Sequence, residues 1–72
     1  MLSSREVCRI LILEGFVEIR QTGSHIIMQK KILQANGEQE TISVVVPYRK
    51  ELRRGTLSSI IRQSKLPKDL FS

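Results

Sequence analysis

The sequence predicts an α+β fold in which a three-stranded antiparallel sheet is covered on one face by two helices. Apolar residues recur at helical spacing near both ends of the chain and alternate with polar residues in the middle. Asn36-Gly37 adds a strong hairpin signal. The 72 residues are expected to form a single domain over 1–72, with 67–72 as a short tail. A chain of this size has room for only one thin core.

A first helix is predicted over about residues 4–14. Ser3 and Glu6 have the spacing of a capping box, in which each side chain bonds the backbone amide of the other residue. Apolar residues then recur at helical spacing, at Val7, Ile10, Leu11 and Leu13. Gly15 can adopt the left-handed conformation that ends a helix.

Three strands are predicted next, near residues 16–20, 26–32 and 41–47, with a turn around Gly23. If the alternating apolar residues face the helices, the covered face carries Val17, Ile19, Ile26, Met28, Ile42, Val44 and Val46. The open face then carries Glu18, Arg20, His25, Ile27, Gln29, Lys31 and Ser43. His25, the only histidine, is therefore expected on the open face or its rim and not in the core.

A second helix is predicted over about residues 56–65, with Thr56 as its N-cap and Pro67 as its stop. The resulting order, α-β-β-β-α, is the layout of a double-stranded-RNA-binding domain. This analogy concerns the fold alone and does not assign a function.

The net charge of +5, from twelve Lys and Arg against seven acidic residues, favours a polyanionic partner, nucleic acid first. A solubilising surface explains the charge equally well. Membrane binding would require a basic amphipathic helix, whereas the basic residues fall mainly around strands and loops. Cys8 is single, no apolar run is long enough to span a bilayer, and no signal peptide is evident. A cytoplasmic protein without membrane contact is expected.

Several chemistries are excluded by residue type. One His and one Cys cannot form a zinc site of the usual stoichiometry. Asp69, the only aspartate, lies in the tail, so a Ser-His-Asp triad lacks its orienting carboxylate. No Walker-type phosphate loop is present. We therefore expect no metal and no small-molecule cofactor.

His25 remains as the candidate proton carrier. RNA cleavage without a metal needs a group that exchanges protons near neutral pH, which histidine does. It also needs cations or amides that hold phosphate; the candidate RNA- and phosphate-binding residues are Arg20, Ser24, Lys30, Lys31, Tyr48, Arg53, Arg54 and Thr56. The alternative is a surface histidine that only satisfies the turn.

Two of these candidates have open alternatives. Arginines are unfavourable beside a helix N-terminus, so Arg53 and Arg54 favour a bound phosphate over a simple solvated loop. Tyr48 could stack a base or close the sheet edge, and the sequence does not distinguish the two.

Four blocks of sequence, in order, resemble one family. They are Gly15-Phe16, Arg20 to His25, Val45-Val46-Pro47, and Leu52 to Gln63. Together they resemble the HicA/YcfA-like mRNA interferase toxins over nearly all of residues 4–66. The resemblance implies a toxin of a type II toxin–antitoxin system with a dsRBD-like fold. It also implies metal-independent endoribonuclease activity on mRNA in the cytoplasm, with His25 as the catalytic residue, and neutralisation by a HicB-like antitoxin that covers the site.

The sequence departs from the family pattern at two positions. Ile26 stands where the family often has a second histidine, and Tyr48 stands where it often has a histidine after Val-Pro. If that later histidine assists catalysis, a tyrosine is a poorer proton donor at neutral pH. A non-catalytic RNA-binding module and a small protein-interaction domain are the competing interpretations.

Overall fold

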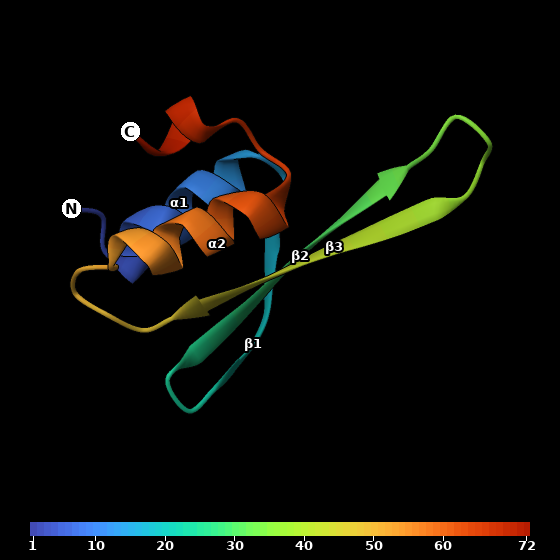
Figure 1. The fold of residues 1–72 in the computed structure, drawn as a ribbon. Coiled ribbons are helices and arrows are strands. Elements are labelled where there is room, and N and C mark those ends of the chain that lie inside the picture. The colour runs from blue at the N-terminus through green and yellow to red at the C-terminus, as the bar shows by residue number, and fades with distance from the viewer.

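The computed structural model describes all residues 1–72. Three antiparallel strands lie in the order β1-β2-β3, and helices α1 and α2 lie together on one side of them (Figure 1). The elements are α1 Ser4–Leu13, β1 Val17–Thr22, β2 His25–Leu33, β3 Gln39–Pro47, α2 Arg54–Ser64 and the 3-10 helix η1 Lys68–Phe71. The predicted α-β-β-β-α order and the open three-stranded sheet are confirmed.

Helix α1 begins and ends as its sequence predicts. The amide of Glu6 donates to Ser3 Oγ at 3.1 Å, and the amide of Ser3 donates to Glu6 Oε1 at 2.8 Å. At the other end Gly15 has φ +97°, and the Phe16 amide donates back to the Leu11 carbonyl at 2.9 Å. This pairing satisfies carbonyls that the helix end leaves free, and it turns the chain into β1.

The predicted orientation of β1 is wrong. Val17 and Ile19, expected on the covered face, are 61% and 51% exposed. Directly opposed residues share a face, and Glu18 lies opposite the fully buried Met28. Burial of Phe16 on the helix side sets this alternation, because a residue two positions later, Glu18, must then face the same way.

An irregularity between Glu18 and Arg20 then shifts the pairing of β1 with β2. After this shift, Arg20 lies opposite Ile27 and Thr22 lies opposite His25. Arg20 and His25 therefore do lie on the open face, as predicted, whereas Glu18 does not.

Helix α2 begins earlier than predicted. Its N-cap is Arg53, whose side chain makes no capping hydrogen bond, so Thr56 lies inside the first turn and is not the N-cap. The Leu57 amide donates to the Arg53 carbonyl at 2.9 Å, which closes the first turn three residues before the N-cap position predicted at Thr56. The helix ends at Ser64, and the C-cap residue Lys65 has φ +60°.

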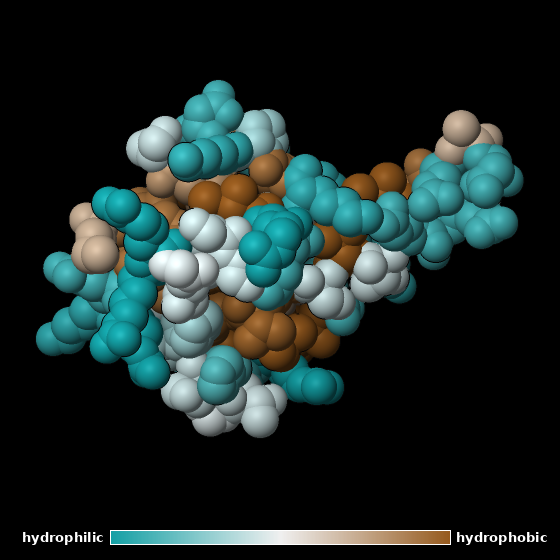
Figure 2. Space-filling view, in the orientation of Figure 1, coloured by the Kyte–Doolittle hydropathy of each residue, from teal (hydrophilic) through white to brown (hydrophobic).

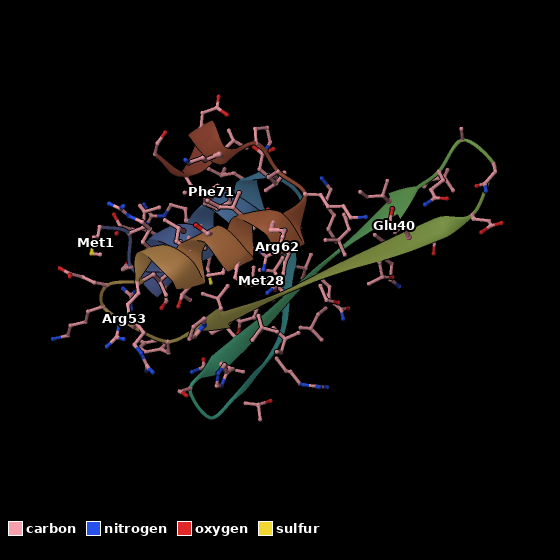
Figure 3. The ribbon with its side chains drawn as sticks, viewed as in Figure 1. Met1, Met28, Glu40, Arg53, Arg62 and Phe71 are labelled. Carbon is pink, nitrogen blue, oxygen red and sulfur yellow. The ribbon has the colours of Figure 1, made fainter.

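The core lies between the helices and the covered sheet face. It contains Val7, Cys8, Leu11, Phe16, Ile26, Met28, Ile42, Val44, Val46, Leu52, Ile60 and Phe71. Leu52 anchors the connection from β3 to α2 and is 2% exposed. Phe71, from the expected tail, packs into the core from η1, while Leu70 beside it stays 39% exposed (Figure 3).

Strands β2 and β3 extend as a two-stranded ribbon beyond the body of the domain (Figure 1). Pairing with β1 reaches only Gln29, so the rest of β2 has a neighbour on one side only. Leu33 near the tip is 70% exposed, although the outer ribbon carries mainly hydrophilic residues (Figure 2). The salt bridge between Lys65 and Glu40, the only one in the structure, ties this ribbon to the end of α2.

Candidate functional site

His25 is the first residue of β2 and follows a two-residue turn, Gly23-Ser24. Gly23 has φ +55°, a conformation that only glycine adopts without cost. The turn is fastened to β3, because the Tyr48 amide donates to the Ser24 carbonyl at 2.6 Å. His25 is exposed on the open face and lies directly opposite Pro47, the last residue of β3.

A buried serine fixes the chain that leaves β3. Ser4, 1% exposed, accepts a hydrogen bond from the Arg49 amide at 2.5 Å through its hydroxyl. The same hydroxyl lies within donating distance of the carbonyls of Pro47 and Arg49. The Ser4 amide donates to the Arg49 carbonyl at 3.0 Å, and the Leu52 amide donates to the Leu2 carbonyl at 2.8 Å. The start of α1 thus clamps residues 47–52.

A cavity of about 520 Å³, here called the α2 cavity, opens at the N-terminal end of α2. It is lined by Pro47, Arg49, Glu51, Leu52, Arg53 and Thr56. Arg53 lies at the very end of the helix (Figure 3), and the first turn has neither an acidic residue nor a capping side chain. Free amides and two guanidinium groups at one cavity are an arrangement suited to an anion such as phosphate.

Pro47 connects the histidine with this cavity. It is the ladder partner of His25 on one side and a wall of the α2 cavity on the other. An exposed histidine and a cavity lined by two arginines therefore lie at the same end of the sheet, with Pro47 as their shared neighbour. This combination can hold a phosphate and move a proton beside it.

The other predicted site residues are dispersed. Arg20 lies on the open face, opposite Ile27, one step along the sheet from His25. Lys31 shares this face but is six residues away along β2, which is about 20 Å at the rise of a strand. Lys30 is on the covered face, where its Nζ lies 5.9 Å from the centre of the Phe16 ring. Arg54 is exposed and lines none of the cavities described here.

Tyr48 does not lie in the α2 cavity. It is 54% exposed and lines a second cavity of about 380 Å³, here called the α1 cavity, between α1 and the ends of β1 and β2. Other walls of this cavity are Arg5, Arg9, Ile12, Leu13 and Glu18. Cys8, a free buried thiol, also borders it, and burial followed by the nearby Glu18 carboxylate raises the pKa of that thiol.

Sequence reasoning missed two residues of the site. Arg49 was visible only as part of a basic connection, and nothing marked it as a wall of a cavity. Ser4 carried no signal at all, because a serine beside an N-cap serine reads as part of the cap. Its role depends on the contact between α1 and the end of β3, 43 residues apart.

Two further features bear on the expected chemistry. No group of three or more His, Cys, Asp or Glu side chains is arranged to hold a metal ion. None of the helices combines the length and the hydropathy required to cross a bilayer.

Comparison with known proteins gives one clear relationship. A family profile described as the HicA toxin of bacterial toxin–antitoxin matches residues 4–66. The match begins at the first residue of α1 and ends beyond α2, so it includes His25, the clamp and the α2 cavity. No curated protein matches the chain. The chain belongs to the HicA toxin family of bacterial toxin–antitoxin systems, whose toxins have an antitoxin partner.

Proposed function

We propose that this toxin is an endoribonuclease that cleaves mRNA without a metal ion, with His25 as the catalytic residue. The observation that carries the proposal is the shared neighbour Pro47, which puts an exposed histidine beside a cavity lined by Arg49 and Arg53. An RNA phosphate is an anion that suits this cavity. The 2′-hydroxyl next to that phosphate carries the proton that His25 would remove.

In the proposed mechanism, His25 removes the proton of the 2′-hydroxyl. The 2′ oxygen attacks the adjacent phosphorus, and the bond to the 5′ oxygen breaks. The 5′ oxygen leaves and takes a proton from water, which gives a 2′,3′-cyclic phosphate and a 5′-hydroxyl, and His25 then returns its proton to the solvent. Arg49, Arg53 and the free amides at the start of α2 stabilise the charge that develops on the phosphate.

The proposal uses only part of the predicted residue set. Arg20 is near enough along the open face to hold a neighbouring phosphate, and Thr56 lines the cavity. Ser24 contributes by fastening the turn through its carbonyl. Three predicted residues take no part in this mechanism. Lys30 lies on the covered face of the sheet, Lys31 lies far along β2, and Arg54 lies outside the α2 cavity. We further propose that the antitoxin is HicB-like, covers this end of the sheet, and meets the toxin in the cytoplasm.

The test is cleavage of labelled RNA by purified wild type and His25→Ala, with folding checked by circular dichroism. His25→Ala should lose cleavage by about 10²–10⁴-fold, the usual contribution of general acid–base catalysis. It should still bind RNA, and EDTA should leave the wild type active. Lys31→Ala, which alters the same strand face about 20 Å away, serves as the matched control and should cleave normally.

Two outcomes would contradict the proposal. Unimpaired cleavage by His25→Ala would remove His25 from the mechanism. Binding by the wild type without any cleavage would favour a non-catalytic RNA-binding module.

A further inference from the structure

The α2 cavity has two neighbouring hollows with which it shares, directly or in turn, lining residues. A smaller hollow of about 310 Å³ shares Arg49 with the α2 cavity and shares Arg5 and Tyr48 with the α1 cavity. The three hollows therefore adjoin in sequence, from the start of α2, past residues 47–50, to the side of α1. We call these three neighbouring hollows together the trough. Figure 2 shows hydrophilic side chains gathered at the end of the molecule where this connection lies.

The walls of the trough carry five cationic side chains and two acidic ones. The cations are Arg5, Arg9, Arg49, Lys50 and Arg53, and the acids are Glu18 and Glu51. None of the seven takes part in a salt bridge. The balance favours an extended anion with charges spaced along it.

One of these cations has a position that costs helix stability, and a second lies one turn away from it. Arg5 and Arg9 are one turn apart on α1, where like charges repel, and Arg5 lies in the first turn, where the helix dipole disfavours a cation. Both line the α1 cavity. A bound phosphate would turn this repulsion into attraction on both guanidinium groups.

The α1 cavity has apolar walls beside these charges. Ile12 and Leu13 form walls that are 56% and 78% exposed, and Tyr48 forms the wall nearest the connecting hollow. A volume of about 380 Å³ is within the range that holds small organic groups. Aromatic and aliphatic walls beside a row of cations are the combination by which proteins bind single-stranded nucleic acid.

We propose that the trough binds a single-stranded flank of the RNA substrate, with phosphates on Arg5 and Arg9 and an unstacked base in the α1 cavity against Tyr48. This inference rests on the proposed function for its substrate, but Arg5, Arg9 and Tyr48 are not among the residues that the proposed mechanism uses. A duplex cannot place a base in the α1 cavity, because its bases are already stacked and paired. The trough thus makes the toxin selective for single strands.

Binding is tested in a His25→Ala background, with a labelled ten-nucleotide RNA free or annealed to its complement. Arg5→Gln with Arg9→Gln should weaken single-strand binding about tenfold and lower the salt slope by about 1.4, the value for two phosphates. Arg62→Gln with Lys68→Gln removes the same net charge outside the trough and should change affinity less than about twofold. Tyr48→Leu should weaken binding about tenfold through lost stacking, with the salt slope unchanged.

The inference is overturned if the two double variants weaken binding equally, or if the duplex binds as tightly as the single strand. A decaglutamate peptide that displaced the RNA at equal concentration would also overturn it, since the trough would then fit an acidic protein. These measurements report binding and need no catalysis, so they test whether the trough binds RNA even if the wild type cleaves nothing. If it does cleave, the Arg5 and Arg9 changes should reduce kcat/KM for ten-nucleotide RNA and spare mixed-sequence tetranucleotides.

Discussion

Ser4 is the residue on which the geometry of the proposed site depends most. Its hydroxyl and amide hold the backbone of Pro47 and Arg49, and those two residues are the neighbours of His25 and of the α2 cavity. Because Ser4 is buried, water cannot replace these hydrogen bonds when the hydroxyl is lost. Ser4 therefore sets the position of the backbone that carries the proposed phosphate-binding groups, although it has no catalytic role itself.

Ser4→Ala should lower the free energy of unfolding by about 1–3 kcal/mol, the cost of leaving buried polar groups unpaired. Ser64→Ala is the matched control. Ser64 is also buried, and its hydroxyl donates to the Ile61 carbonyl at 2.7 Å and accepts from the Leu66 amide at 3.2 Å, but it lies at the far end of α2. Urea denaturation should give similar losses for the two variants.

Cleavage assays well below both melting temperatures should then separate the two serines. Ser4→Ala should raise KM for RNA several-fold, because residues 47–52 lose their clamp, whereas Ser64→Ala should leave KM unchanged. Equal KM values for both variants would mean that Ser4 contributes only stability.

At the scale of single elements, β1 shows that a sequence pattern alone cannot tell which of two neighbouring apolar positions is buried. Val17 and Ile19 alternate with charged residues and read as an inward-facing pair. Phe16 immediately before them buries more area, and its burial forces Val17 outward and Glu18 inward. Elements whose signals agree, such as the capping box of α1 and the Asn36-Gly37 hairpin, were predictable from local residues alone.

The start of α2 and the α2 cavity were not predictable for a different reason. Thr56 has a better intrinsic preference for the N-cap than Arg53, yet the burial of Leu52 fixes where the chain turns into the helix. His25 was found because it is the only residue of its type and strand alternation gave its face. The walls of the cavity come from tertiary contacts, and no local pattern reveals those.

The orientation of β1 gives a stability prediction. Phe16→Ala should cost about 3–5 kcal/mol, as expected for removing a buried aromatic ring. Val17 is 61% exposed, so Val17→Ala should cost less than about 1 kcal/mol. Thermal and urea denaturation of both variants would measure the two costs. Comparable losses would show that Val17 is buried on the covered face.

The contact between β3 and α2 should make stability sensitive to acid. Hydrogen bonds from Lys65 and then from Gln34 hold the pKa of Glu40 below its ordinary value of 4.5. A lowered folded-state pKa stabilises the protein above the unfolded pKa, and this contribution is lost as the pH falls from about 4.5 through the folded value.

Glu40→Gln should therefore reduce Tm at pH 7, and the difference from wild type should shrink as the pH falls below 4.5 and the wild-type carboxylate becomes protonated. Calorimetry of wild type and variant across this range would measure the difference. Lys65→Gln should show the same convergence, because it removes the main cause of the shift. A Tm difference that stayed constant with pH would assign the Glu40 effect to packing.

At the scale of the whole molecule, positive charge opposes the folded state. A net charge of +5 is accompanied by a single salt bridge, so most cations repel one another without local compensation. Membership of a toxin–antitoxin family implies an antitoxin partner, and an acidic surface on that partner would neutralise this repulsion.

Added salt should consequently stabilise the free toxin. Raising NaCl from about 0.01 M to about 0.5 M shortens the screening length well below the size of the molecule, so Tm measured by calorimetry should rise by a few degrees. Arg54→Gln, which removes an exposed cation beside the positive end of α2, should raise Tm at low salt and reduce its salt dependence. A wild-type Tm that fell with salt would show that attractive charge pairs dominate.

The β2–β3 ribbon also determines where the molecule can be altered safely. Its tip around Asn36 lies away from both helices (Figure 1), and residues 34–38 make their backbone hydrogen bonds among themselves. Exposed tips of this kind tolerate insertion. A fluorophore, an affinity tag or a protease site placed there would report on the toxin while the clamp, the trough and His25 keep their native surroundings.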